Sequence, residues 1–243
     1  MSNEPEIRIL STPQELFQGA AAEFLALASA AIRDRGKFTV ALSGGSTPKS
    51  LYSVLAKAAL PWEKIFFFWG DERHVPPDHP DSNYRMANEA LLSKVGVRPE
   101  NVLRIRAEED ADIAAHDYEQ TIKSFFQLRP GEFPRFDLIL LGLGPDGHTA
   151  SLFPDTAALS ETKRLVVANW VEKLKTHRIT FTYPVLNHAA CVMFLVSGGD
   201  KAHMVRTVLE DEQANLPSRK VQPINGKLLW MLDLAAAGKL SKR

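Results

Sequence analysis

The sequence lacks several features that would assign it to a particular class of protein. It has one cysteine, Cys191, so it can form no internal disulfide and no cysteine-rich metal site. Lysine plus arginine and aspartate plus glutamate both number 29, so the formal net charge is zero. A nucleic-acid binder, or a protein held on a membrane by a basic face, needs an excess of positive charge. We therefore expect neither nucleic acid nor a membrane as partner.

Targeting and membrane signals are also missing. The first six residues are polar and acidic, unlike the basic start of a signal peptide. No continuous apolar run approaches the roughly 18 residues that a membrane span needs. Cys191 lies in the apolar run 191–196, where we expect a buried and unreactive side chain. Together these absences predict a soluble protein of a reducing cytoplasm.

What the sequence does have is a regular alternation of apolar strands and amphipathic helices. Hydrophobic residues make up 45% of the 243 residues and charged residues 24%, as in ordinary globular proteins. Strands are expected at 38–42, 65–69, 136–141, 165–169, 178–182, 191–196 and 228–232. Helices are expected from Pro13 to Gly36, after Pro48, and near 83–94, 110–127 and 200–210.

This alternation predicts an α/β fold. Strands that are apolar throughout are typical of a mostly parallel sheet covered by helices on both faces, a three-layer Rossmann-like domain. No glycine-, serine- or proline-rich linker divides the chain, so we expect one domain over residues 1–243. The first helix has clear end signals: Thr12 suits the N-cap, Pro13 the first helical position, Glu15 a capping box and Gly36 the end.

Two of the apolar strands are followed by Ser-Gly-Gly and then by a helix. The first of these turns comprises Ser43, Gly44, Gly45, Ser46 and Thr47. Ligands of parallel α/β sheets bind beyond the carboxyl ends of the strands, where backbone N–H groups and a helix start attract anions. We interpret the turn as an anion site, though not a Walker A loop. The alternative is a plain turn with a threonine cap.

The second Ser-Gly-Gly turn, at 197–199, precedes Asp200 and Lys201. Asp200 is the expected helix cap, which places Lys201 in the first helical turn. A cation there opposes the partial positive charge of the helix start. A bound phosphate would remove that conflict, so we interpret Lys201 as a phosphate ligand. The alternative is a lysine that points into solvent.

The glycine-rich segment 142–154 follows the strand expected at 136–141. It matches G-x-G-x-x-G, but Pro145 and the polar turn after it crowd the segment, and no acidic residue follows a second strand about 20 residues on. We therefore reject a dinucleotide site. Asp146 and His148 remain, two residues apart on a turn at a strand end. Histidine suits proton transfer near neutral pH, so we interpret the pair as catalytic, with a structural histidine as the alternative.

Charged residues also follow the strand expected at 65–69. The segment 70–76 contains two carboxylates, a guanidinium and an imidazole, which could be a solvated run of charge. The strand before it is wholly apolar, and the loop is long and stiffened by prolines, a pattern more typical of a functional loop. Asp71 and Arg73 are therefore candidate site residues.

These segments, taken in order, resemble the 6-phosphogluconolactonase family. The resemblance rests on 43–48, 69–73, 81–84, 142–154, 178–180 and 197–202, and spans the chain from about residue 11 to about residue 233. It implies hydrolysis of 6-phospho-D-glucono-1,5-lactone to 6-phospho-D-gluconate in the oxidative pentose phosphate pathway. It also implies a Rossmann-like fold with no required cofactor and no metal.

The residue types then suggest a mechanism. A δ-lactone is an activated ester, so one base that deprotonates a water molecule is sufficient. We expect His148 to be that base, with Asp146 or a nearby backbone group orienting it. The turn 43–47, Arg178 and Lys201 would hold the phosphate. Arg73 is a further cation for the phosphate or the sugar hydroxyls, and Asp71 is also expected in the substrate site. We expect the sugar phosphate lactone as partner, and a monomer or weak homodimer.

Two other functions stay open. Glucosamine-6-phosphate isomerases/deaminases resemble the chain in several of these motifs, and Asp71 would then be a carbon base. Deaminases, however, typically carry an Ala-Phe-Asn-Glu-Pro-like run where residues 149–154 read Thr-Ala-Ser-Leu-Phe-Pro, and often an aromatic residue at the position of Arg73. The other alternative is a non-catalytic sugar-phosphate sensor, which would be expected to lack Asp146 and His148. The sequence favours the lactonase.

Overall fold

The computed structural model describes residues 4–241. Its larger sheet has six strands in the order β1-β9-β8-β5-β2-β3, and every neighbouring pair is parallel. The strands are β1 (Glu6–Leu10), β2 (Phe38–Leu42), β3 (Ile65–Trp69), β5 (Leu138–Leu141), β8 (Cys191–Val196) and β9 (Lys227–Asp233). β2, β5 and β8 are buried along their whole length. The predicted α/β class is confirmed.

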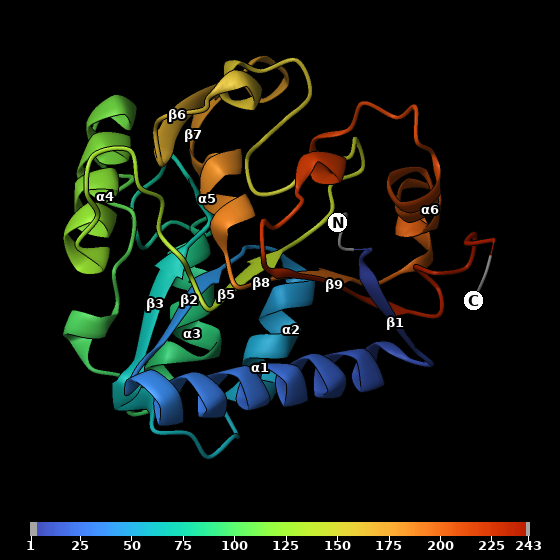
Figure 1. Cartoon of the computed structure of the whole chain (residues 1–243), viewed down its shortest axis with the longest axis horizontal. Helices are drawn as coiled ribbons and strands as arrows, with labels where there is room; N and C mark the ends of the chain where they lie inside the picture. Colours follow the sequence, from blue (N-terminus) through green and yellow to red (C-terminus); the bar gives the residue numbers. More distant parts are fainter. Residues whose placement is uncertain (1–3, 242–243) are drawn as a thin grey trace.

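Helices cover the large sheet on both sides (Figure 1). They are α1 (Pro13–Arg35), α2 (Ser46–Leu55), α3 (Asn83–Ala90), α4 (Ala111–Phe126), α5 (Tyr183–His188) and α6 (Ala202–Glu210). α1 packs on α2 and on β1, β2 and β9 along one side of the sheet, and α4 and α5 lie on the other. Cys191 is buried and free, as expected.

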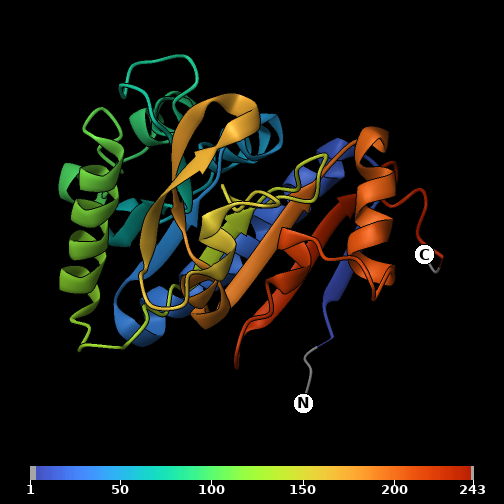
Figure 2. The same cartoon turned by 90° about the horizontal axis from the view of Figure 1, so that it is seen from above.

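The strands predicted at 165–169 and 178–182 are confirmed, but they belong to a second sheet that the sequence did not reveal. These residues form β6 (Val166–Val171) and β7 (Thr176–Phe181), which pair antiparallel with each other, and β7 also pairs antiparallel with β4 (Asp71–Arg73). This small sheet lies above the large one in Figure 1 and in front of it in Figure 2, next to α4. An apolar run does not reveal which strand it will pair with, so sequence periodicity could not separate the two sheets.

Gly70 joins the two sheets. It is the only residue between β3 and β4, and its N–H donates to Leu42 O at the end of β2 (2.9 Å). Its carbonyl accepts from Phe181 N at the end of β7 (2.8 Å). The chain therefore passes from the parallel sheet to the antiparallel sheet within one residue, and the position of Asp71 is fixed by both sheets.

The sequence signals at the ends of α1 are confirmed. Glu15 N donates to Thr12 Oγ1 (3.1 Å), and Gly36 ends the helix in the left-handed region at φ 75°. The Glu15 side chain accepts from Ser11 N (3.0 Å), one residue before the N-cap, and not from Thr12 N as in a standard capping box. β1 was not expected, because Glu6 and Arg8 interrupt its hydrophobic pattern at the edge of the sheet.

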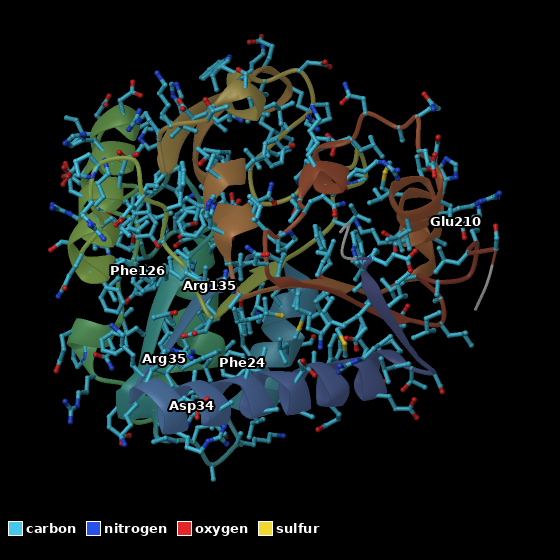
Figure 3. All side chains as sticks on the ribbon, in the orientation of Figure 1. Phe24, Asp34, Arg35, Phe126, Arg135 and Glu210 are labelled. Carbon is cyan, nitrogen blue, oxygen red and sulfur yellow. The ribbon has the colours of Figure 1, made fainter. Side chains whose placement is uncertain are left out.

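α1 is long and apolar enough to cross a membrane by length and composition, and it is the one such helix among residues 4–241. In this fold it is amphipathic: Phe24 is fully buried in the core, whereas Asp34 and Arg35 are exposed at its carboxyl end (Figure 3). Arg35 pairs with Asp137 Oδ1 (2.5 Å), whose Oδ2 accepts from the N–H and hydroxyl of Thr39 (both 2.8 Å). These bonds fix the amino ends of β2 and β5 to α1.

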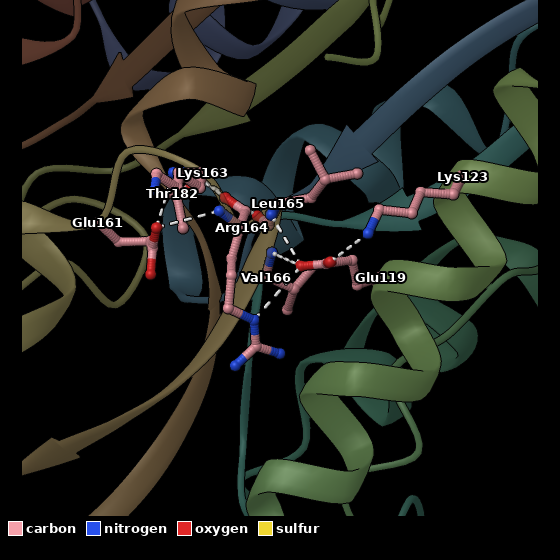
Figure 4. Close-up of polar contacts among 8 residues, drawn as sticks. All are labelled: Glu119, Lys123, Glu161, Lys163, Arg164, Leu165, Val166 and Thr182. Carbon is pink, nitrogen blue, oxygen red and sulfur yellow. Dashed lines mark hydrogen bonds and ion pairs between the residues drawn. The ribbon is translucent and has the colours of Figure 1, made fainter. Parts of the chain in front are cut away.

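Glu119 attaches α4 to the small sheet (Figure 4). Its Oε2 accepts from the backbone N–H groups of Leu165 (2.8 Å) and Val166 (3.3 Å), at the start of β6, and its Oε1 accepts from Lys123 (2.5 Å). Burial by itself raises the pKa of Glu119, but the bonds from Lys123 and the two N–H groups outweigh it and hold that pKa below its ordinary value of 4.5. The ionised carboxylate therefore stabilises the fold.

We expect Glu119→Gln to lower the free energy of unfolding by about 1 kcal/mol at pH 7, because it removes the charge from these hydrogen bonds. The folded-state pKa is lowered, so the contribution of Glu119 is present above about pH 4.5 and is lost as the pH falls through the folded value. Urea unfolding at pH 7 and at pH 4 should show the difference shrinking at low pH. The exposed Glu212→Gln is the control. An equal loss at both pH values would contradict this assignment.

Candidate active site

A cavity of about 260 Å³ lies at the carboxyl ends of the central strands. The turn after β2, β4, the start of α3, the loop after β5 and the turn after β8 all contribute to it. The residues lining it are Ser43, Gly44, Asp71, Arg73, Asn83, Gly142, Leu143, Gly144, Pro145, His148, Thr149, Ala150 and Lys201. Segments far apart in the sequence therefore converge where parallel α/β sheets bind ligands.

Most of the residues singled out from the sequence lie in or around this cavity. Those that line it are Ser43, Gly44, Asp71, Arg73, His148 and Lys201. Those that do not line it are Gly45, Ser46, Thr47, Asp146 and Arg178. Asp146 contacts His148, and Arg178 lies beside Arg73 in the small sheet, so these two adjoin the lining residues.

His148 is held tightly against the loop that carries it. Its Nδ1 lies 2.5 Å from Asp146 Oδ1, and its ring stacks on Phe153 with 4.0 Å between centroids. A Cβ atom on Gly144 would come within 2.0 Å of that Nδ1, so only glycine leaves room for the imidazole. The G-x-G spacing that formally matched a dinucleotide motif here provides space for a histidine.

The charges around His148 set its protonation state. Burial lowers the pKa of His148 below its ordinary value of 6.5, and Lys173 adds to this, while Asp146 and Asp71 act in the opposite direction. Burial would raise the pKa of Asp146, but hydrogen bonds from Lys173 and His148 lower it to about 2. Near neutral pH the pair is therefore a carboxylate and a neutral imidazole, the state that a general base requires.

Sequence reasoning missed Lys173. Its ammonium group forms an ion pair with Asp146 Oδ2 and lies 4.7 Å from the centroid of the Phe153 ring. Lys173 belongs to the short turn between β6 and β7 and follows Asp146 by 27 residues. No local pattern links the two positions, so the contact becomes visible only once the small sheet is placed.

Asp71 is buried beside His148 and bound by two side chains that the sequence did not assign a role. Ser151 Oγ donates to Asp71 Oδ2 (2.6 Å), and Asn83 Nδ2 donates to the Asp71 carbonyl (3.0 Å). A Cβ atom on Gly44 would come within 1.8 Å of Asn83 Oδ1. Gly44 therefore makes room for Asn83. The sequence had suggested a different role for this glycine, in a turn whose backbone N–H groups bind an anion.

The neighbouring Glu72 faces away from the cavity and supports α3. It accepts from the N–H groups of Asn83 (2.7 Å) and Tyr84 (2.8 Å) and from Ser82 Oγ (3.2 Å). Burial raises the pKa of Glu72 in spite of these donors. The two adjacent carboxylates thus differ in role: Asp71 lines the cavity, whereas Glu72 orients the helix that supplies Asn83.

The turn after β2 offers an unpaired hydroxyl group. Tyr52 OH bonds both Ser43 N (3.0 Å) and Ser43 O (2.8 Å), which fixes the backbone of the turn. Ser43 Oγ is buried at the cavity and has no hydrogen-bond partner within residues 4–241. α2 begins at Ser46 with Gly45 as N-cap and no side-chain cap, so the alternative of a threonine cap is wrong.

The turn after β8 differs from the expectation. Gly198 precedes the short 3₁₀ turn Gly199–Lys201, and Asp200 makes no cap bond there, so its assignment as a cap is wrong. Asp233 instead accepts from Gly198 N (3.0 Å) and from the Ser197 hydroxyl. These two donors, which we expected to bind an anionic ligand, therefore bind a carboxylate of the protein itself. Lys201 is partly buried and lines the cavity, and so does not point away into solvent.

Two arginines face each other across the small sheet. Arg73 and Arg178 are directly opposite in the antiparallel pairing of β4 and β7. Burial lowers the pKa of Arg178, and the positive charge of Arg73 adds to the effect. Two like charges directly opposite each other on paired strands repel, so this pair of arginines favours the binding of an anionic ligand. No group of three or more His, Cys, Asp or Glu side chains in residues 4–241 could hold a metal ion.

Comparisons with known proteins agree with this geometry. Residues 11–230 match the model of the family described as glucosamine-6-phosphate isomerases/6-phosphogluconolactonase. A 6-phosphogluconolactonase from Nostoc sp. is 49% identical over 87% of this chain and 88% of its own length. One from Synechocystis sp. is 46% identical over 97% of this chain and 98% of its own length. The structure titled 6-phosphogluconolactonase from Trypanosoma cruzi superposes with a TM-score of 0.89 at 33% identity, covering 99% of this chain and 98% of that one.

We expect the ring of His148 to titrate below pH 6.5, as its burial dictates. Asp146→Asn should lower that value further, because Asp146 favours the imidazolium. NMR titration of the histidine ring resonances measures both values, and His148→Ala identifies the resonance. The exposed His203 is the internal control and should not respond to Asp146→Asn. A wild-type value above 6.5, or a rise in Asp146→Asn, would contradict the electrostatic assignment.

Proposed function

Because the chain belongs to the family of glucosamine-6-phosphate isomerases and 6-phosphogluconolactonases, we propose that it hydrolyses 6-phospho-D-glucono-1,5-lactone to 6-phospho-D-gluconate with His148 as general base. The activity is that of a carboxylic ester hydrolase in the oxidative pentose phosphate pathway. The observation that supports His148 best is its pairing with an ionised Asp146 at the wall of the cavity.

The first step is attack by water. Nδ1 of His148 faces Asp146, so Nε2 is the basic nitrogen that accepts the proton of the water. The new hydroxide oxygen bonds to the lactone carbonyl carbon, and the carbonyl oxygen becomes an oxyanion that backbone N–H groups of the glycine-rich turns would stabilise. The oxyanion then re-forms the carbonyl as the bond from this carbon to the ring oxygen breaks, and the imidazolium returns its proton to the ring oxygen. Proton and electron pairs balance without a cofactor.

The other end of the cavity suits the phosphate. Ser43 offers a buried hydroxyl that has no hydrogen-bond partner within residues 4–241, and Lys201, which also lines the cavity, offers a cation. Arg178, next to Arg73, gains an anionic partner that relieves the repulsion between the two guanidinium groups. Each charge-assisted hydrogen bond contributes roughly 1.5–3 kcal/mol, so losing them together would explain selection for the phosphorylated lactone.

The isomerase/deaminase alternative is less well supported. It needs Asp71 as a base on carbon, yet Ser151 already donates to one oxygen of Asp71 and Asn83 bonds its carbonyl. The run Thr-Ala-Ser-Leu-Phe-Pro at 149–154 also differs from the run typical of deaminases. Assaying acid release from fresh 6-phosphogluconolactone beside ammonia release from glucosamine 6-phosphate separates the two activities.

The same proposal covers the organisation and location of the protein. A single domain over residues 1–243 is supported by the bonds of Gly70 to both sheets. A cytoplasmic location is supported by the cysteine content, because a chain with one buried, free cysteine has no internal disulfide and needs no oxidising compartment to fold. We further propose a monomer or weak homodimer.

We expect His148→Ala to lower kcat by roughly 10²–10⁴-fold, the usual contribution of a positioned general base, with much less change in KM. The rate must be corrected for spontaneous hydrolysis of the lactone. His203→Ala, which removes an exposed imidazole from α6, is the matched control and should keep wild-type activity. A His148→Ala variant that keeps more than about a third of the wild-type kcat would remove His148 from the mechanism.

We expect Lys201→Ala and Arg178→Ala to weaken mainly the binding of the phosphate. Loss of one charged partner should lower kcat/KM by about 10–150-fold on the phosphorylated lactone. Unphosphorylated glucono-1,5-lactone should be a poor substrate for the wild type, and the variants should be little worse on it. The exposed Lys220→Ala is the control for a change of surface charge.

A loss of the same factor on both lactones would show that Lys201 does not act through the phosphate. Thermal unfolding of the ligand-free protein gives a second check. Lys201 opposes the partial positive charge of the helix start that follows it, so Lys201→Ala should be as stable as the wild type or slightly more stable. A marked fall in Tm would instead support a structural role.

A further inference from the structure

The turn between β6 and β7 reaches the loop that carries His148. It is the 3₁₀ turn Glu172–Leu174, at one end of the small sheet that lies above the large one (Figure 1). Lys173, in the middle of this turn, forms the ion pair with Asp146. The turn thus connects an antiparallel hairpin to a loop that follows a strand of the parallel sheet.

Asp146 is shared between two cationic or protonatable groups. Its Oδ1 lies 2.5 Å from His148 Nδ1, and its Oδ2 bonds Lys173. Phe153 supports both partners: the His148 ring stacks on it at 4.0 Å, and Lys173 Nζ lies 4.7 Å from its centroid. Each oxygen of the carboxylate is therefore held by a different segment of the chain, one by its own loop and one by the β6–β7 turn.

We propose that Lys173 is a positioning residue of the hydrolysis, which fixes Asp146 and through it the imidazole of His148. This inference rests on the proposed function, because it needs His148 to be the base. Lys173 does not line the substrate cavity, so it acts on His148 through Asp146 and through its charge. It is a positioning residue and not a catalytic one.

A purely stabilising role fits Lys173 poorly. Its side chain is 52% exposed, and exposed ion pairs contribute little to stability. What it does change is the charge near His148. On the far side of Asp146 a groove is also lined by Asp112 from α4, Asp155, Glu172 and His177. Of the described residues lining that groove, Lys173 alone carries a permanent positive charge.

The sign of the effect follows from these neighbours. Lys173 lowers the pKa of His148, whereas Asp146 and Asp71 raise it. Without Lys173, Asp146 would keep its negative charge near neutral pH and interact with His148 alone, beside Asp112, Asp155 and Glu172. Both changes favour the imidazolium, so the pKa of His148 must rise and less of the neutral base is present at a given pH.

The test compares Lys173→Met and Lys173→Arg with the wild type. Lys175→Met is the matched control, because Lys175 is exposed two residues away in the same hairpin. Two measurements are made on each: the background-corrected pH profile of kcat/KM, and NMR titration of the His148 ring. Met keeps most of the aliphatic length of lysine and removes the charge, and Arg keeps the charge.

We expect Lys173→Met to move the midpoint of the acidic limb of the kcat/KM profile to higher pH. The pKa of His148 measured by NMR should rise with it, by on the order of half a pH unit. The kcat of Lys173→Met on the alkaline plateau should fall roughly tenfold, since the base is less well oriented, with KM nearly unchanged. Lys173→Arg should restore the position of the limb, and Lys175→Met should match the wild type.

The outcomes separate this inference from the mechanism it rests on. Suppose that His148→Ala is inactive but Lys173→Met changes neither the midpoint pH of the acidic limb, nor the NMR pKa of His148, nor kcat. Lys173 then has no positioning role. An equal response of Lys175→Met would also overturn it, because the effect would then be one of general surface charge. If the NMR value shifts without any kinetic shift, His148 is not the base, and the catalytic part of both proposals fails.

Discussion

The backbone of Gly70 is the constraint on which the site depends. Its N–H bonds to the end of β2, its carbonyl accepts from the end of β7, and the next residue is Asp71. The two bonds of this residue hold the small sheet against the carboxyl ends of β2 and β3. His148 comes from a loop of the large sheet, whereas Arg73, Lys173 and Arg178 come from the small one. The charges that surround the proposed base therefore depend on how the two sheets are joined.

The parts of the site that the sequence could predict are those encoded locally. A glycine-rich turn after an apolar strand, or an acid two residues from a histidine, can be recognised within about ten residues. Such segments meet in the fold because parallel strands have their carboxyl ends on the same side of the sheet. Ser43, His148 and Lys201 were found this way, and all three line the cavity.

The parts that could not be predicted depend on contacts between distant segments. Lys173 reaches Asp146 only because β6 and β7 form a separate hairpin, and Asn83 bonds Asp71 across 12 residues only because Gly44 has no side chain. Apolar patterning showed that 165–169 and 178–182 were strands but not which strands they would join. The assignment of Asp200 as a cap was wrong for a related reason: Asp233, from the next strand, supplies the bond to the turn.

The bonds of Arg35, Asp137 and Thr39 lie at the opposite edge of the sheet from the cavity, where the central strands begin. The attachment of α1 is therefore separated in space from the cavity that holds His148. Because none of these three residues lines the cavity, a substitution among them changes how firmly α1 is attached and removes no group from the cavity wall. A protein divided in this way can gain thermal stability during evolution or engineering without the loss of activity that usually accompanies it.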